Sequence, residues 1–201
     1  MDQPVSRRRG WPVWLTCLVV FVVLAVICGG CGISTVVGGY NKAVGLGEAV
    51  DSAWSEVENQ LKRRHDLIPN LVETVKGYAK HEKELFENIA KARTQYFQAD
   101  TRGKKMAAAN NISGLLSRLL VLREAYPQLK ANESFLKLQD SLEGTENRLT
   151  VARKRFNDAV RAANTYRKEF VGRFFANWVG LEEAEYFKAP EQAKETPKVA
   201  F

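Results

Sequence analysis

The sequence predicts an all-α protein: an N-terminal transmembrane helix followed by an elongated antiparallel helical bundle or coiled coil. Three observations predict this fold. Residues 11–37 form an uncharged, mostly apolar stretch long enough to cross a bilayer. Beyond residue 48, apolar residues recur at helical and heptad spacing. Almost no alternation of apolar and polar residues, the pattern of a strand, occurs. With 201 residues, the chain has room for one domain besides the anchor.

The apolar stretch follows a basic tail, residues 1–10, which contains Arg7, Arg8 and Arg9. A cleaved signal peptide would also begin with basic residues, but its apolar region would be shorter. We therefore interpret residues 11–37 as a retained transmembrane helix, with the lipid bilayer as its partner. Because basic residues favour the cytoplasmic side, we expect the N-terminus in the cytoplasm and the body outside it.

Glycine is frequent where the anchor meets the body. Gly30, Ser34 and Gly38 recur every four residues, so three small side chains share one helix face, the pattern by which membrane helices approach closely. This pattern favours self-association through the span, although small residues are common in spans generally. Residues 38–47 form either a flexible neck or the close-packing end of the anchor. Cys31, which follows two glycines, leaves lipidation after cleavage as an alternative.

Residues 48–188 are predicted to form the helical bundle. From Val50 onward, two apolar seams offset by four residues run along the chain, which indicates coiled-coil packing. The seams predict a first helix over residues 43–98. Pro69 lies inside this helix and removes one backbone hydrogen bond, so we expect either a kink or a break with a fold-back there.

Turn-forming residues at positions 100–103 end the first helix. A second helix then continues to Tyr126, where Pro127 ends or bends it. Asn132 is a preferred N-cap residue and opens a third helix of about 45 residues. Residues 189–201 are rich in proline and charge, which predicts an extended tail.

The unequal lengths of these helices predict a homo-oligomer. The first and third helices are much longer than the second, so a three-helix cross-section cannot extend over the whole body. Part of the apolar seam then stays uncovered, unless a second protomer or a fold-back at Pro69 covers it.

Two charged residues, Arg64 and Glu82, occupy seam positions. An unpaired buried charge costs several kcal/mol, so we expect each of them to find a partner on another helix and to help set the register. The alternative is that both positions are wet. The candidate partners on the third helix are Glu146, Arg148, Arg153 and Asn157.

The sequence shows no catalytic constellation. His65 and His81 are the only histidines, and they lie too far apart on one predicted helix to share a metal. No phosphate-binding loop, GxSxG or HExxH motif is present. We therefore predict a protein that is not an enzyme and that has no cofactor or metal.

The net charge of +7 comes from basic and acidic residues that are interspersed along the chain. It indicates either a solvated helical surface or attraction to anionic lipid head groups beside the anchor. Nucleic acid is not an expected partner, because no basic block with interleaved aromatic residues occurs.

Long segments of the body resemble the LemA family of bacterial membrane proteins. The most specific are RRHDLIPNLV, beginning at Arg63, and YPQLKAN, beginning at Tyr126. Shorter matching segments are Tyr40-Asn41, Ala53–Ser55, Gly77–Ala79, His81-Glu82, Ala92-Arg93, Glu146–Arg148 and Arg153–Asn157. The family usually has a proline soon after the position of Asn164, but here none occurs before Pro190, so the far end of the third helix departs from the family pattern.

The resemblance implies a single-pass protein of the bacterial cytoplasmic (inner) membrane with a helical body and no established enzymatic activity. Family members often occur genomically beside a membrane metalloprotease of envelope quality control, and one branch takes part in shaping magnetosome membranes. We therefore expect a self-associating scaffold that organises or remodels the membrane; the alternative is an adaptor of a membrane metalloprotease in envelope stress. The candidate structural or interaction residues are Arg64, Pro69, Glu82, Arg93, Tyr126, Pro127, Glu146, Arg153 and Asn157.

Overall fold

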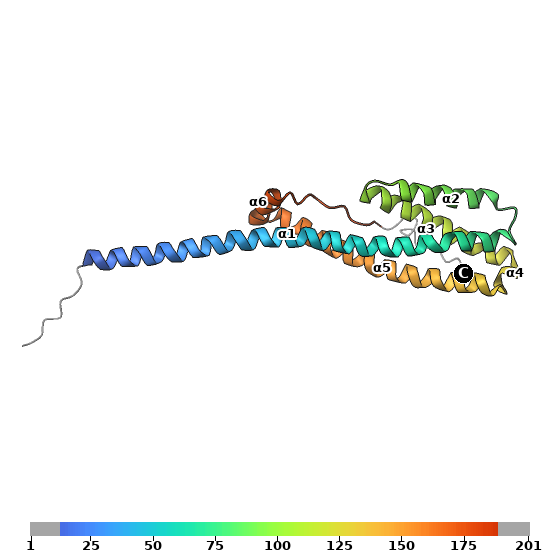
Figure 1. The fold of residues 1–201 in the computed structure, drawn as a ribbon, viewed down its shortest axis with the longest axis horizontal. Coiled ribbons are helices and arrows are strands. Elements are labelled where there is room, and N and C mark those ends of the chain that lie inside the picture. The colour runs from blue at the N-terminus through green and yellow to red at the C-terminus, as the bar shows by residue number, and fades with distance from the viewer. Residues whose placement is uncertain (1–12, 189–201) are drawn as a thin grey trace, which may run out of the picture.

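The computed structural model describes residues 13–188, so the predicted basic tail 1–10 and the predicted extended tail 189–201 lie outside the described residues. The described part forms helices joined by short connections and contains no strand, which confirms the all-α fold (Figure 1). The helices are α1 (Val13–Lys76), α2 (Lys83–Gln98), α3 (Arg102–Ala125), α4 (Pro127–Lys130), α5 (Glu133–Lys168) and α6 (Phe170–Val179).

Helix α1 is a continuous helix of 64 residues whose N-terminal half projects alone from the body (Figure 1). Within residues 13–188, it is the one helix long and apolar enough to cross a membrane, and the apolar part of it is not covered by the rest of the chain. Residues 38–47 are helical, so the alternative of a flexible neck is wrong. The glycines there instead allow close packing, because a Cβ at Gly39 would overlap the ring of Phe175.

The prediction of one helix over residues 43–98 is wrong, because α1 ends at Lys76 and the chain reverses into α2. The break is not at Pro69, which lies on the exposed face inside α1. The amides of Tyr78 and Ala79 both donate to the carbonyl of Val75, at 2.9 Å each, and so form a turn. Heptad spacing did not reveal this turn, because two antiparallel helices that each bury one face have the same spacing as one long helix.

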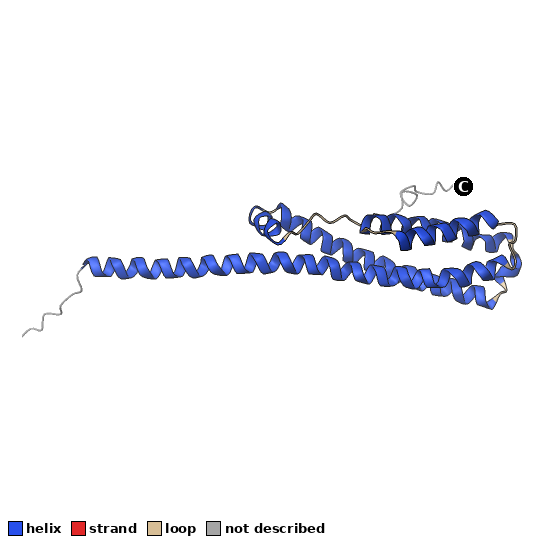
Figure 2. Cartoon of the chain, turned by 45° about the horizontal axis from the view of Figure 1, so that its top comes forward, coloured by secondary structure: helices blue, strands red, loops and turns tan. Residues whose placement is uncertain are grey.

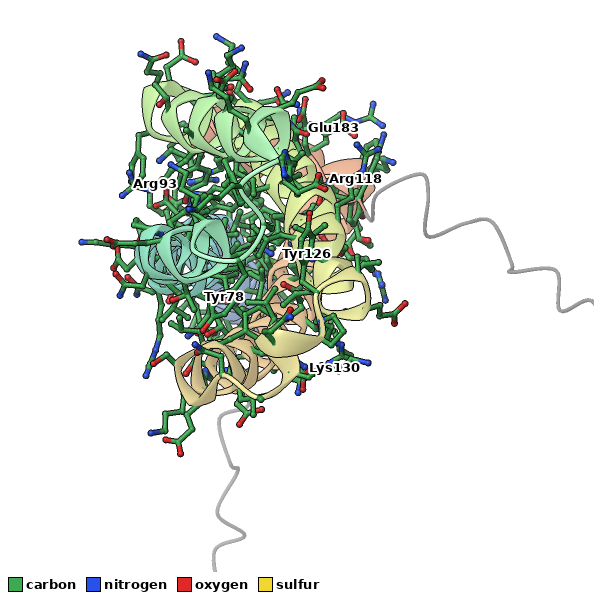
Figure 3. All side chains as sticks on the ribbon, turned by 90° about the vertical axis from the view of Figure 1, so that its right-hand side faces the viewer. Tyr78, Arg93, Arg118, Tyr126, Lys130 and Glu183 are labelled. Carbon is green, nitrogen blue, oxygen red and sulfur yellow. The ribbon has the colours of Figure 1, made fainter. Side chains whose placement is uncertain are left out.

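The body is a bundle of two helix pairs. Helix α5 lies antiparallel along α1, and the hairpin of α2 and α3 packs on this pair, so four helices surround one core at the end far from the anchor (Figure 3). The largest fully buried apolar side chains of the core come from α1, α2, α3, α4 and α5. They are Leu61, Ile68, Leu71, Ile89, Ile112, Leu119, Leu129, Phe135, Leu149 and Phe156.

Local sequence signals set several helix ends. The side chain of Thr101 accepts a hydrogen bond from the amide of Lys104, and the side chain of Asn132 accepts one from the amide of Phe135, so both residues are N-caps. Pro127 occupies the first turn of α4, where its missing amide proton costs nothing. The predicted turn, the predicted N-cap and the predicted proline corner are therefore all present.

The predicted third helix of about 45 residues is shorter in the structure, because α5 ends at Lys168 and the chain turns at Glu169 into α6. Gly172 permits this sharp turn, since a Cβ there would overlap the backbone carbonyl of Tyr166. Helix α6 ends at Gly180, which has a positive φ of 71°, a conformation that glycine adopts without strain. Figure 2 shows α6 nearly end-on beside α1, so α6 runs across α1 rather than along it.

After α6, residues 181–188 run as an extended segment back along the bundle; we call this segment the C-terminal strap. The side-chain amide of Asn164 exchanges two hydrogen bonds with the backbone of Ala184, at 2.9 and 3.1 Å. Asn157 does the same with Phe187, at 3.0 and 2.8 Å. Asn157 and Asn164 are two helical turns apart on α5, a distance of about 10 Å. Ala184 and Phe187 are three extended residues apart, which is also about 10 Å, so each asparagine lies opposite its own backbone partner.

The fold-back of α2 and the strap change one inference from the sequence. Both cover parts of the α1–α5 pair, so unequal helix lengths no longer require a second protomer. Self-association therefore stays a prediction that depends on other surfaces.

Candidate functional site

The most polar part of the core is a buried arginine network, formed by Arg64, Ser113, Glu146 and Arg153 and the carbonyl of Ala109. Arg64 lies on α1 and is 2% exposed. Its Nη1 donates to Glu146 Oε2 at 2.7 Å and to Ser113 Oγ at 2.9 Å, and its Nη2 donates to the Ala109 carbonyl at 3.0 Å. One side chain thus connects α1 to both α3 and α5, as expected for a charge on the heptad seam.

Arg153 extends the network toward the C-terminal strap. Its Nη1 lies 3.5 Å from Glu146 Oε1, and its guanidinium lies over the ring of Phe187, 4.4 Å from the ring centroid. Two arginines therefore share one carboxylate. Burial lowers the pKa of Arg64 and of Arg153, whereas the negative charge of Glu146 opposes both shifts.

His65, the neighbour of Arg64, is completely buried. Its ring stacks on the ring of Tyr96, with centroids 4.0 Å apart, and neither ring nitrogen has a hydrogen-bond partner among the described residues. Burial, and then the positive charges of Arg64 and Arg93, lower the pKa of His65 to about 4. The imidazole is therefore neutral at pH 7 and serves the core as an aromatic ring.

The network holds helices together rather than presenting reactive groups. Arg64 is closed off from solvent, and Glu146, its carboxylate partner, is occupied by two arginines. Within residues 13–188, no three histidine, cysteine, aspartate or glutamate side chains are grouped so that they could hold a metal ion. The arrangement joins α1, α3 and α5 through one side chain.

The structure brings some of the predicted site residues together and separates others. Arg64, Glu146 and Arg153 meet in the network, and Asn157 binds the strap residue whose ring lies on Arg153. Arg93, on α2, lies over the ring of Phe97 at 5.2 Å and near His65.

Glu82 is not on a buried seam. It is the residue before α2, where its backbone carbonyl accepts from the amide of Phe86, and its carboxylate forms no ion pair with another described residue. The hypothesis that Glu82 pairs with Arg148 or Arg153 is therefore wrong. The physical reason is the turn after α1, which removes Glu82 from the seam.

Pro69, Tyr126 and Pro127 also lie outside the network. Tyr126 ends α3 and packs its ring partly into the core, and Pro127 begins α4. Figure 3 shows Tyr126 and Tyr78 at the end of the bundle that carries the turns. The hydroxyl of Tyr78 accepts a hydrogen bond from the side-chain amide of Asn132 at 2.9 Å, so the turn after α1 is tied to the start of α5.

Sequence reasoning missed Ser113, Asn164 and Phe187. Asn157 and Asn164 are one heptad apart and lie on the same face of the helix. Because buried amides require hydrogen-bond partners, this spacing could have indicated that an extended segment of backbone packs along that face. Ser113 had no comparable signal, since a serine on a helix usually bonds its own backbone.

A groove of about 730 Å³ lies between α1, residues 101–103 and residues 179–185. Its polar lining is mostly acidic, and Arg102 is its basic member, bonded to Asp51 at 2.6 Å. The acidic residues are Glu48, Asp51, Glu182, Glu183 and Glu185.

In the projecting half of α1, Gly30, Ser34 and Gly38 lie on one exposed face. A Cβ at Gly30 or at Gly38 would meet no atom within 4 Å, and the hydroxyl of Ser34 donates to the carbonyl of Cys31 within the helix. The face is therefore open within a single chain.

Comparison with known proteins points to one family. Residues 53–201 match the profile of the LemA family. Among curated proteins, the chain is similar to magnetosome proteins MamQ 1 and MamQ 2 of Paramagnetospirillum magneticum, each 25% identical over 90% of this chain and 74% of the relative. It is also similar to magnetosome protein MamQ of Magnetospirillum gryphiswaldense, 22% identical over 82% of this chain and 70% of the relative.

Proposed function

Because the chain belongs to the LemA family, we propose that this membrane-associated protein is a non-enzymatic scaffold that self-associates and organises or remodels the membrane. The observation that carries the proposal is the continuity of α1, which forms both the apolar span and the longest helix of the bundle. A helix without a break between membrane and body transmits position and orientation rigidly, and a scaffold requires this property.

Two further observations support a scaffold. The polar network of the core joins helices, and its one carboxylate, Glu146, is engaged by two arginines, which favours a structural role over catalysis. The similar curated proteins are named as magnetosome proteins, and the similarity extends over 90% of this chain in two of them, so it includes more than the anchor.

We assign self-association to the face of α1 formed by Gly30, Ser34 and Gly38. Small side chains let two helices in a membrane approach closely enough for backbone van der Waals contact. The open surroundings of Gly30 and Gly38 leave room for a second helix.

Crosslinking in native membranes, with identification of the products by mass spectrometry, tests the function. We expect crosslinked oligomers of the wild type and a strong loss of them in the double variant Gly30→Leu/Gly38→Leu. Gly32→Leu is the matched control, because Gly32 also has open surroundings but lies on the opposite side of α1. Products that contain a membrane protease and no second copy would instead support the adaptor function.

The scaffold proposal includes a location and an orientation. We place the protein in the bacterial inner membrane as a single-pass protein, with the N-terminus in the cytoplasm and the bundle on the extracytoplasmic side. The cluster Arg7–Arg9 before the span supports this orientation.

A further inference from the structure

Helix α6 exposes an apolar face that the body of the protein does not cover. Phe170 is 94% exposed, Phe174 67% and Trp178 59%, and Val171 beside them is also exposed. Because Phe170, Phe174 and Trp178 are four residues apart, their side chains form one stripe. Large exposed apolar patches mark interaction surfaces, whereas single exposed apolar residues, such as Phe97 on α2, are ordinary.

The opposite face of α6 holds it against α1 at the point where the predicted span ends. The ring of Phe175 lies directly over Gly39 and clusters with Ala43 and Tyr166. The hydroxyl of Tyr166 donates to the carbonyl of Gly39 at 2.9 Å, which fixes the end of α5 to the same turn of α1. Helix α6 thus has a defined position, docked at Gly39, two residues beyond the last residue of the predicted span.

The exposed stripe reaches α1 next to the end of the predicted span. The ring of Trp178 meets the ring of Tyr40 edge-on, with centroids 5.5 Å apart. Val179, on the adjoining face, packs against the cluster of Ala43, Tyr166 and Phe175. Trp178 therefore contacts α1 three residues after Val37, the last residue of the predicted span. Because α6 runs across α1 (Figure 2), a span that crosses the bilayer places α6 parallel to the membrane plane.

The stripe is continuous with the lipid-facing surface of the span. Val36, Val37 and Tyr40 are exposed on α1 immediately before and at the contact with α6, and no charged residue precedes Lys42 in this part of α1. The exposed charges on α6, at its junction with α5 and on the neighbouring turn of α1 are three basic residues and one acidic residue, as suits anionic head groups. They are Lys42, Lys168, Glu169 and Arg173, whereas the exposed Glu182 and Glu183 follow the end of α6.

We propose that α6 is an interfacial membrane helix, which inserts Phe170, Val171, Phe174 and Trp178 at the boundary between head groups and acyl chains of the bilayer that α1 crosses. Apolar and aromatic side chains on one face of such a helix, with basic residues beside them, bind this boundary. The protein is then attached to the membrane at two points, and the second attachment sets the tilt and the rotation of the bundle about α1. The proposal depends on the anchoring by α1 and is independent of self-association.

The test uses the full chain, reconstituted in vesicles of phosphatidylcholine and phosphatidylglycerol, with Cys17, Cys28 and Cys31 replaced by serine. An environment-sensitive fluorophore is attached to a single cysteine introduced by Phe174→Cys. Arg173→Cys, on the polar edge of the same helix, is the matched control, and Phe97→Cys reports an exposed aromatic position on α2, away from α6.

We expect a blue-shifted emission at position 174, with loss of fluorescence when lipids carry a nitroxide near the top of the acyl chain. Positions 173 and 97 should show neither effect. Emission at position 174 equal to that at position 97 would overturn the proposal. So would a blue shift that nitroxide lipids do not quench, because a second protein chain would then cover the stripe.

A second variant tests the docked position. Gly39→Leu pushes Phe175 off α1. Quenching of the fluorophore at position 174 by nitroxide lipids should therefore decrease, and its emission band should broaden, because α6 no longer has one position. Gly45→Leu is its control, because a Cβ at Gly45 meets no atom within 4 Å. Unchanged quenching in Gly39→Leu would overturn the docked geometry on which the proposal rests.

Discussion

Arg64 is the side chain that joins three helices of the bundle. Its guanidinium is buried, and its bonds to Glu146, Ser113 and the Ala109 carbonyl are the means by which that burial is tolerated. A carboxylate at position 146 is half-exposed and would be well solvated without Arg64, whereas Arg64 without the carboxylate would be a buried charge. The two partners are therefore not equivalent.

We predict that Glu146→Leu destabilises the protein by about 2 kcal/mol, because it leaves Arg64 buried without its counter-charge. The double variant Arg64→Met/Glu146→Leu should recover part of this loss, since apolar replacements of buried pairs are often neutral, whereas Arg153 still lacks the carboxylate that it shares with Arg64. Denaturation of the full chain in detergent, followed by circular dichroism, measures both. Glu82→Leu is the control and should stay close to wild type, because Glu82 has no ion pair with a described residue; a Glu146→Leu variant as stable as this control would contradict the prediction.

His65 makes the stability depend on pH. Its pKa falls from 6.5 in the unfolded chain to about 4 in the core, because burial and the charges of Arg64 and Arg93 disfavour the imidazolium. The unfolded chain thus binds a proton more readily than the folded one. Above pH 6.5, His65 is neutral in both states and does not change the free energy of unfolding with pH. As the pH falls from 6.5 toward 4, protonation of the unfolded chain lowers the free energy of unfolding by at most about 1.4 kcal/mol per pH unit.

We predict that His65→Phe, which keeps an aromatic ring against Tyr96, flattens the decrease of the free energy of unfolding between pH 6.5 and 4. The difference between wild type and variant isolates this residue from the other titrating groups. His81→Phe, at an exposed position, is the control and should keep the wild-type pH profile. Parallel profiles for wild type and His65→Phe would show that His65 does not titrate in this range.

At the scale of elements, α1 is notable for passing through Pro69 without ending. The proline lacks an amide proton, so the carbonyl of the residue four positions earlier has no partner within the helix. The residue lies on the exposed face, where its ring contacts no core side chain. Core side chains of α1 lie on both sides of Pro69, with Ile68 before it and Leu71 and Val75 after it, so the helix packs against the body along this whole stretch.

We predict that Pro69→Ala raises the free energy of unfolding by about 1 kcal/mol, because the restored hydrogen bond outweighs the greater freedom of the unfolded chain. The maximum dimension from solution scattering should not change, since α1 already passes through this residue. Thermal unfolding gives the stability. A shift in the maximum dimension, or a loss of stability, would show that Pro69 shapes the tertiary arrangement.

At the scale of the whole molecule, the orientation of the long axis decides what the bundle can contact. We predict that protease added to intact spheroplasts digests the bundle, and that the protein stays in the membrane fraction after carbonate extraction. Both follow from the uncharged span and the basic residues before it. Spheroplasts opened by sonication are the control for protease access. Protection of the bundle in intact spheroplasts would place it in the cytoplasm.

Features that depend on neighbours along the chain were predictable. The span follows from composition, the start of α5 from the N-cap Asn132, and the corner between α3 and α4 from Pro127. The partner of Arg64 was also predictable as one of a few residues, because a buried charge on a heptad seam requires an opposite charge or hydrogen-bond acceptors on a facing helix, and Glu146 was among those candidates.

The sequence by itself therefore determined the helical class, the apolar stretch long enough to cross a membrane and most apolar positions of the core, because these follow from composition, from the period of apolar residues and from local capping. Only the tertiary structure decided where α1 reverses, where α6 lies and what the strap covers. These depend on contacts between residues far apart in the chain, such as Phe175 on Gly39 and Phe187 on Asn157. The helical spacing of apolar residues predicts that a face is buried, but it does not predict which segment of the chain covers that face.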